Sequence, residues 1–364
     1  MYDLSILRRS ADMETADRRS GRLSMYEVAG EMKILFIMMA IAFLGSCAFA
    51  ADGGFLFTTF RDETTPMSEQ IYMGISKDGR QWDALNGGNP ILVSDVGELG
   101  VRDSFLLRSH DGHKVWLIAT DLCIARNGDW NRATHHGSRS LVVWETSDLV
   151  HWTKPRLAVV APDDAGCAWA PEAIYDEDTG EYLVYWASMT AADNFSKQRI
   201  WAARTKDFRS FSTPFMYVEK ANHVIDIDIV HDGDSYYRFT KDDKEKAVLM
   251  ETSKKLMGPW QEMPQFTAGH GKNFEGPICY QLSRGKGRKH PVWCLLLDNV
   301  SDRIGRGAFG YMPFLSNDLS TGQFTPATDF HFPYPFRHGS VLPITTAERK
   351  RLEAAYSVSQ TVDR

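Results

Sequence analysis

Four acidic side chains are the candidates for chemistry in this chain of 364 residues. Each of them opens an apolar run that predicts a β-strand, and they are Asp103, Glu172, Asp226 and Glu275. Carboxylates that converge on one site repel each other, which raises the pKa of at least one of them. Because catalytic acids and bases need shifted pKa values, such a cluster is a candidate functional site. A single Asp at a strand start is more often a turn or capping residue, so the fold must bring the four together.

Two repeated phrases indicate which elements position these carboxylates. The first phrase is a Ser or Thr, a turn built around Asp or Gly, and an aromatic residue a few positions later. Its five copies begin at Ser76, Ser147, Thr205, Ser253 and Ser316. The second phrase is a polar or acidic opening, an apolar strand, an Asp/Gly turn and a strand rich in Tyr and Trp. It occurs over residues 102–120, 169–188, 224–240 and 275–297. The sequence therefore predicts an almost all-β chain with one short helix at 347–356.

The two ends of the chain complete each other. The Ser/Thr phrase at residue 76 has no opening strand before it, and the opening strand at residues 337–344 has no Ser/Thr phrase after it. Pairing of the N-terminal strands 55–60 and 70–76 with this C-terminal strand would close a ring. Five units of about 63 residues fit residues 51–364, against roughly 40–50 residues for a four-stranded blade. We therefore predict a single five-bladed β-propeller over residues 51–364, with the acidic openings at one mouth of its channel.

The five strand openings, taken in order, resemble those of glycoside hydrolase family 43. They are Arg102-Asp103, Trp169-Ala170-Pro171-Glu172, Val224-Ile225-Asp226, Glu275-Gly276-Pro277 and Arg337-His338-Gly339. The resemblance covers residues 55–352 and implies a five-bladed propeller that hydrolyses arabinan, arabinoxylan or xylan linkages with inversion. Carried over by position, it implies that Asp103 is the general base, Glu275 the general acid, and Asp226 the carboxylate that tunes the acid.

The implied roles fit the chemistry of inversion. A protonated acid must reach the leaving oxygen while an ionised base holds a water on the opposite face, with the two carboxyl groups roughly 6.5–9.5 Å apart. An ionised Asp226 beside Glu275 would keep the acid protonated. Two features depart from the family pattern. Ser104 follows the base where the family often has Pro, and Asp228 lies on the same face of a regular strand as Asp226, so the sequence does not separate these two aspartates.

Further residues at the predicted mouth are candidates for substrate binding. They are Trp169, Glu172, Phe274, Arg337 and His338. Trp169 is a sugar-stacking platform or a core aromatic, and Glu172 binds substrate or hydrogen-bonds at the rim. Arg337 contacts sugar hydroxyls or pairs with a channel carboxylate. Asp62 mimics the base motif but follows the closing strand, which favours a loop role.

His338 has three interpretations: a core histidine, a substrate contact, or a contact to an ion in the channel. The family often places a hydrated cation, usually Ca²⁺, near this histidine, so the resemblance implies a structural Ca²⁺ but no cofactor for the chemistry. Imidazole is a poor ligand for a hard cation. We therefore expect a single or water-mediated contact between His338 and the metal.

The first 50 residues predict export. Met32-Lys33, an apolar run over residues 34–44 and a small-residue exit are typical of a secretory signal, and a bilayer-spanning helix needs about 20 apolar residues. Two exits compete: residues 48–50 suit ordinary cleavage, whereas residues 44–47 resemble a bacterial lipobox that would leave lipidated Cys47 at the new N-terminus. Residues 1–31 then precede the true start. We expect a bacterial protein that is periplasmic or anchored to the membrane through Cys47, with free, buried thiols at the four later cysteines.

Composition and resemblance together define the hypotheses for function. With 41 Lys+Arg against 47 Asp+Glu, a net charge of −6 and no long basic run, the chain is not expected to bind nucleic acid. The leading hypothesis is an exported glycosidase that acts on arabinose- or xylose-containing oligo- or polysaccharide and releases α-L-arabinofuranosyl residues. β-Xylosidase and endo-arabinanase are the nearest alternatives. The alternative from another class is a carbohydrate-binding propeller whose carboxylates only hydrogen-bond sugar hydroxyls.

Overall fold

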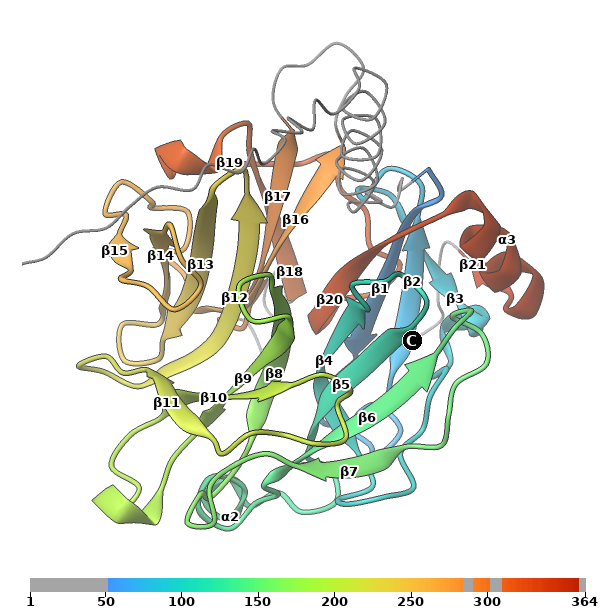
Figure 1. Ribbon diagram of the computed structural model, residues 1–364. Coiled ribbons are helices and arrows are strands. Elements are labelled where there is room, and N and C mark those ends of the chain that lie inside the picture. The colour runs from blue at the N-terminus through green and yellow to red at the C-terminus, as the bar shows by residue number, and fades with distance from the viewer. Residues whose placement is uncertain (1–51, 284–290, 302–309, 360–364) are drawn as a thin grey trace, which may run out of the picture. The chain divides into compact units, whose positions relative to one another are not determined.

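The computed structural model describes residues 52–283, 291–301 and 310–359, and their strands form five antiparallel β-sheets (Figure 1). Four sheets follow the chain strand by strand. The first contains β4 (Val101–Arg108), β5 (Val115–Asp121), β6 (Ser140–Thr146) and β7 (Arg156–Val159). The second contains β8 (Trp169–Asp176), β9 (Glu181–Ser188), β10 (Arg199–Thr205) and β11 (Phe215–Val218). The third contains β12 (Val224–Asp232), β13 (Ser235–Asp242), β14 (Ala247–Ser253) and β15 (Gln261–Glu262). The fourth contains β16 (Phe274–Ser283), β17 (Val292–Asn299), β18 (Gly310–Ser316) and β19 (Thr325–Pro326).

The fifth sheet joins the two ends of the described chain, and we call it the closing sheet. Its strands in order are β20 (Arg337–Ile344), β1 (Gly54–Phe60), β2 (Tyr72–Ser76), β3 (Trp82–Leu85) and β21 (Val358–Ser359). Leu56 pairs with Leu342 and Phe57 with Val341 across β1 and β20. The first strands of the five sheets, β4, β8, β12, β16 and β20, contact one another in turn and return to β4. The predicted five-bladed propeller and its closure are therefore confirmed.

Short helices connect some of the strands. They are η1 (Asn86–Gly88), α2 (Trp130–His135), η2 (Ala191–Asp193), η3 (Leu319–Thr321) and α3 (Thr346–Ala355). Helix α3 begins with a capping box in which the Thr345 side chain accepts from the Glu348 backbone and the Glu348 side chain accepts from the Thr345 backbone. This helix confirms the one predicted near residues 347–356. No helix among the described residues is both long and apolar enough to cross a membrane.

The Ser/Thr phrase forms the turn between the third and fourth strand of each blade. The Ser76 hydroxyl accepts from a backbone N–H three residues later at 2.9 Å, and Asp78 accepts from the two N–H groups that follow. Thr146 and Asp148 do the same in the next blade, so that copy begins at Thr146 and not at Ser147. The aromatic residue of the first copy, Trp82, is fully buried between the closing sheet and the fourth sheet, and the aromatic residues of the other copies are partly buried.

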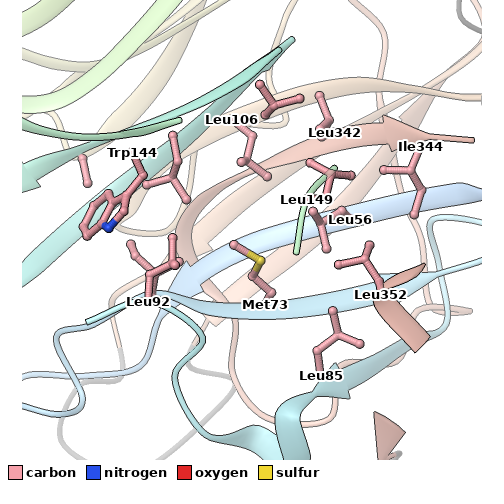
Figure 2. Packing of buried hydrophobic residues seen from close by; sticks show 14 of the residues in the cluster. Leu56, Met73, Leu85, Leu92, Leu106, Trp144, Leu149, Leu342, Ile344 and Leu352 are labelled. Atoms are coloured by element: carbon pink, nitrogen blue, oxygen red, sulfur yellow. The ribbon is translucent and has the colours of Figure 1, made fainter. Parts of the chain in front are cut away.

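The hydrophobic core lies between neighbouring sheets. One cluster combines Leu56 and Met73 of the closing sheet with Leu106 and Trp144 of the first sheet and Leu352 of α3 (Figure 2). All five side chains are buried, and burying a side chain of this size contributes about 1.5–3 kcal/mol. Each blade is thereby fixed to the next, which holds the starts of the inner strands at constant distances. The four described cysteines, Cys123, Cys167, Cys279 and Cys294, are free and buried, as predicted.

Candidate active site

A β-bulge interrupts the start of four inner strands, β4, β8, β12 and β16. In each bulge one residue has a left-handed backbone: Asp103 (φ 49°), Ala170 (φ 47°), Asp226 (φ 46°) and Gly276 (φ 50°). All four line the central channel. Non-glycine residues rarely adopt this conformation, and such strain is concentrated at functional sites. At Gly276 an added Cβ would come within 2.5 Å of the His338 ring, so that position requires glycine for space as well.

One buried histidine contacts all three predicted catalytic carboxylates. His338 Nδ1 lies 3.1 Å from Asp103 Oδ1, and its Nε2 lies 3.4 Å from Glu275 Oε1 and 3.6 Å from Asp226 Oδ2. Asp226 and Asp103 raise the pKa of His338 well above its ordinary value, because their negative charges outweigh the burial that opposes protonation. An imidazolium at this point holds Asp103 on one edge of the ring and Asp226 and Glu275 on the other.

Asp103 is held as a carboxylate. Burial opposes its ionisation, but the hydrogen bond and charge of His338 and the charge of Arg102 outweigh burial, and the pKa of Asp103 is lowered. Thr120 Oγ1 donates to Asp103 Oδ2 at 2.9 Å. The next residue, Ser104, is buried and its hydroxyl hydrogen-bonds to Thr58 of β1 at 2.8 Å. These bonds fix the direction of Asp103 although no proline follows it, and an ionised, fixed carboxylate is what a general base requires.

The structure separates Asp226 from Asp228. Asp226 Oδ2 accepts from the Gly276 N–H at 3.0 Å and lies near Glu275, whereas Asp228 Oδ2 accepts from the Cys279 N–H at 2.7 Å. Burial raises the pKa of Asp226 to about 6, with His338 opposing and Glu275 and Asp103 adding to the rise. Both carboxylates face β16, so their different partners on that strand, and not the face on which they lie, distinguish the two aspartates. Asp226 is therefore the neighbour of the predicted acid.

Glu275 is the most solvent-accessible of the three carboxylates. Its side chain is 16% exposed, compared with 13% for Asp103 and 8% for Asp226. Its Oε1 lies 3.6 Å from Arg337 Nη2 in addition to the 3.4 Å contact with His338. A carboxyl group that is positioned by two cationic side chains and still reaches solvent can approach the oxygen of a bound sugar.

Glu172 lies within the channel and not on an open binding surface. It is buried, Tyr185 OH donates to its Oε2 at 3.5 Å, and it hydrogen-bonds to Asp228. Two carboxyl groups can share a hydrogen bond only if one of them carries a proton. Burial, followed by the charges of Asp228 and Asp226, raises the pKa of Glu172 well above its ordinary value. This placement favours the interpretation of Glu172 as a hydrogen-bonding residue of the channel.

The Glu172–Asp228 pair predicts a pH-dependent cost in stability. Burial raises the pKa of Asp228 to about 7, so above pH 4 the folded chain keeps a proton that the unfolded chain releases. The free energy of unfolding therefore falls as the pH rises from about 4 to about 7. The measurement is the free energy of unfolding in urea at pH 4.5 and at pH 7.5. In Asp228→Asn the difference between these two free energies should be smaller than in the wild type by at least about 1.4 kcal/mol, which is the value of one pKa unit. Asp232→Asn, at the end of the same strand, is the control, and equal slopes in wild type and Asp228→Asn would contradict the prediction.

A hydrated Ca²⁺ does not fit the channel as the described residues form it. Ligand-type atoms of Asp226, Glu275 and His338 lie within 4.8 Å of one another. The cavity beside them measures about 20 Å³, which holds about one water molecule. Ca²⁺ needs six to eight oxygen ligands at about 2.3–2.6 Å. We therefore derive no step through a cation, and His338 acts here through the carboxylates that it contacts.

Three of the predicted substrate-binding residues, Arg337, Phe274 and Trp169, differ in whether they are buried or can be reached from solvent. Arg337 is only 1% exposed and its Nε lies 3.1 Å from Asp298 Oδ2, which corresponds to the alternative of pairing with a channel carboxylate. Phe274 is buried and packs against Phe314 with ring centroids 5.9 Å apart, so it belongs to the core and the prediction of a sugar contact was wrong. Trp169 is half-buried and keeps a surface that a ligand can reach.

Sequence reasoning missed a group of charged residues behind the site. Glu63 Oε1 lies 3.0 Å from Arg102 Nη2 and 3.6 Å from Arg337 Nη1, and both guanidinium groups stack on the ring of Phe60. Asp298 is fully buried opposite Glu275 on β17. The signal for Asp298 was a charged residue at the end of an otherwise apolar strand. Glu63 carried no signal, because the β1–β2 loop brings it to the site; its neighbour Asp62 caps a turn there, as predicted.

Comparison with known proteins places this fold and site in a family. Residues 51–350 match the family model of the glycoside hydrolase family 43-related group, described as a probable glycosyl hydrolase domain. The chain belongs to this family, so the class of protein is that of the glycoside hydrolases, and the resemblance stated from the strand openings is confirmed.

The individual proteins and structures similar to this chain are either much longer than it or share little sequence identity with it. A protein of Bifidobacterium longum subsp. longum named α-L-arabinofuranosidase is 31% identical over 300 residues, which cover 70% of this chain and 28% of that protein. The chain thus spans little more than a quarter of the length of this relative. An exo-β-1,3-galactanase structure from Phanerochaete chrysosporium has 15% identity, TM-score 0.44, and coverage of 65% of this chain and 50% of that chain. The catalytic domain of a Coprinopsis cinerea family 62 α-L-arabinofuranosidase has 12% identity, TM-score 0.43, and coverage of 65% and 70%.

Proposed function

We propose that this protein is an inverting glycosidase that releases α-L-arabinofuranosyl residues from arabinose- or xylose-containing oligo- or polysaccharide. The observation that carries the proposal is the arrangement around His338. An ionised Asp103 contacts one nitrogen of the ring at 3.1 Å and Glu275 contacts the other at 3.4 Å. The two carboxyl groups thus lie at opposite nitrogens of one imidazole ring, an arrangement that supports a base and an acid acting on one bond.

In the proposed reaction Asp103 takes a proton from a water molecule while the oxygen of that water bonds to the anomeric carbon. The bond from this carbon to the leaving oxygen breaks on the opposite face, and Glu275 gives its proton to that oxygen. The enzyme is then left with a protonated Asp103 and an ionised Glu275, and proton exchange with solvent restores the starting state. Asp226, 3.6 Å from the same His338 nitrogen that contacts Glu275, tunes and orients the acid.

The choice of sugar rests on the named relative. The Bifidobacterium longum protein is named α-L-arabinofuranosidase, which supports arabinofuranoside cleavage before the alternatives, β-xylosidase and endo-arabinanase. The alternative of a non-catalytic carbohydrate-binding propeller is less well supported, because hydrogen bonds to sugar hydroxyls do not require one carboxylate with a lowered pKa opposite an accessible acid.

We also propose that the protein is exported from a bacterial cell. The proposal rests on the signal-like segment at residues 32–50 and on Cys47 as the candidate lipid anchor. These residues, and the assignment of residues 1–31 to an upstream extension, lie outside the described part of the chain. The single catalytic domain is proposed to span residues 51–364.

One proton NMR experiment on the wild type tests the proposed activity. Methyl α-L-arabinofuranoside, methyl β-D-xyloside, methyl β-D-galactoside and debranched arabinan are incubated with the enzyme, and the first-formed free sugar is observed before it mutarotates. We expect arabinose from the arabinofuranoside, first in the inverted configuration. Release of xylose alone would show that the substrate is a xyloside and not an arabinofuranoside. Arabinose that appears first in the retained configuration would contradict the inverting mechanism. No free sugar from any of the four substrates would contradict the proposal that the protein is a glycosidase.

A further inference from the structure

Trp130 presents a large aromatic surface to solvent beside the site. It is the first residue of α2, in the connection between β5 and β6, and it is 40% exposed. Every other described tryptophan is more deeply buried. One exposed apolar residue is ordinary by itself, but an exposed indole whose amphipathic ring contacts Arg102 and Trp169 offers a surface on which a ligand can pack.

The helix that carries Trp130 is fixed from both sides. Asp129 caps it by accepting from the Arg132 N–H at 2.9 Å, and the Arg132 guanidinium holds the Glu98 carboxylate with two contacts of 2.9 and 2.8 Å. Ala133 is fully buried and packs with apolar residues that follow β5. The indole is therefore held in place before any ligand arrives, which lowers the entropy cost of binding to it.

Trp130 contacts two residues that are sequence neighbours of residues lining the site. The Arg102 guanidinium lies 5.3 Å from the centroid of the Trp130 ring, and Arg102 immediately precedes Asp103. On its other edge Trp130 meets Trp169 at a centroid distance of 6.1 Å and an interplanar angle of 83°. The residue after Trp169 donates its N–H to Thr120, the residue that holds Asp103. The ring thus packs against the residues on either side of the hydrogen bonds that hold Asp103.

We propose that Trp130 forms the floor of a second sugar-binding subsite, which takes the substrate unit next to the one that is cleaved, with Trp169 and Arg102 as its support. This inference rests on the proposed function and extends it, because it makes an oligosaccharide the substrate. The apolar C–H face of a sugar ring packs on the exposed indole, while Arg102, fixed by Glu63 at 3.0 Å, prevents the indole from turning away. Pockets combine apolar and aromatic surface with a few placed polar groups, and here the indole supplies the first and Arg102 the second.

The test measures binding and turnover separately. In a Glu275→Gln background, isothermal titration with α-1,5-arabinotriose and with xylotriose should show that at least one of them binds. Trp130→Ala should weaken that binding about 10-fold, the loss expected for truncating an aromatic anchor. Trp130→Phe, which keeps a ring, should restore affinity to within threefold. Met216→Ala on β11, an exposed apolar residue of another blade, is the matched control and should leave binding and activity unchanged.

Turnover with an intact Glu275 gives the second measurement. Trp130→Ala should lower the ratio of kcat/KM for arabinotriose to kcat/KM for methyl α-L-arabinofuranoside about 10-fold. Equal losses on both substrates, affinity equal to that of the parent, or binding of neither trisaccharide would overturn the subsite. Weaker binding in Trp130→Ala while the wild type cleaves no arabinoside would support the subsite and reject the proposed function, so the two failures are distinguishable.

Discussion

Glu275→Gln lowers kcat on methyl α-L-arabinofuranoside by about 10²- to 10⁴-fold, the usual contribution of a general acid. The amide keeps the size of the side chain and its place beside Arg337 and His338, which lie 3.6 and 3.4 Å from the carboxylate in the wild type, but it has no acidic proton. Methoxide is a poor leaving group, so it depends on that proton. Steady-state kinetics at constant pH measure the loss.

A matched control substitution tests whether the loss of kcat is specific to position 275. Glu262→Gln on β15 makes the same chemical change at a side chain that is 72% exposed and has only a 3.5 Å contact with Lys220. Surface ion pairs of this kind contribute about 0–1 kcal/mol, so activity should stay within twofold of the wild type. Activity of Glu275→Gln within tenfold of the wild type would remove Glu275 from the role of acid.

Asp103→Asn causes a loss of similar size by a different route. Its carboxylate has a lowered pKa and contacts His338 at 3.1 Å, and it is the group that accepts the proton of the attacking water. The amide keeps one acceptor oxygen for His338 or Thr120 but does not take up a proton, so kcat should fall about 10²- to 10⁴-fold. The loss should be independent of the leaving group, because the base acts on the water.

The control for the base is Asp234→Asn, in the exposed turn between β12 and β13, where Asp234 pairs with Lys254 at 2.8 Å. It should leave kcat unchanged within twofold, and the thermal unfolding midpoint of each variant shows whether the fold is retained. A folded Asp103→Asn enzyme with nearly full activity would show that another group activates the water.

The order of the blades could be predicted from the sequence because local chemistry repeats. Each third-to-fourth turn needs a hydroxyl and usually an Asp to accept backbone N–H groups, as Ser76 and Asp78 do, and this requirement leaves the same phrase in every blade. The closure was predictable for a related reason. The Ser/Thr phrase at residue 76 has no opening strand before it, and the opening strand that forms β20 has no Ser/Thr phrase after it. Residues at the starts of inner strands must meet at the channel, which brought Asp103, Asp226 and Glu275 together.

The details of the site depend on backbone geometry that residue types do not encode. The left-handed bulge at Asp226 places its carboxylate at the Gly276 N–H, whereas Asp228 accepts from the Cys279 N–H, and residue types alone do not predict this difference. The sequence left Arg337 between a contact to sugar hydroxyls and a pairing with a channel carboxylate, and in the structure three carboxylates and the Phe60 ring enclose it. Phe274 could have been assigned correctly, because alternation from an inward Glu275 already directs its neighbour into the core.

The most direct test of the central claim, that Asp103 and Glu275 act as base and acid on one glycosidic bond, compares two leaving groups. Methyl and 2,4-dinitrophenyl α-L-arabinofuranoside are given to Glu275→Gln and to Asp103→Asn, and kcat is compared with that of the wild type. The dinitrophenolate leaves without protonation, so Glu275→Gln should recover most of its activity on that substrate and Asp103→Asn should recover none. Equal responses of the two variants to the change of leaving group would contradict the assignment of acid and base.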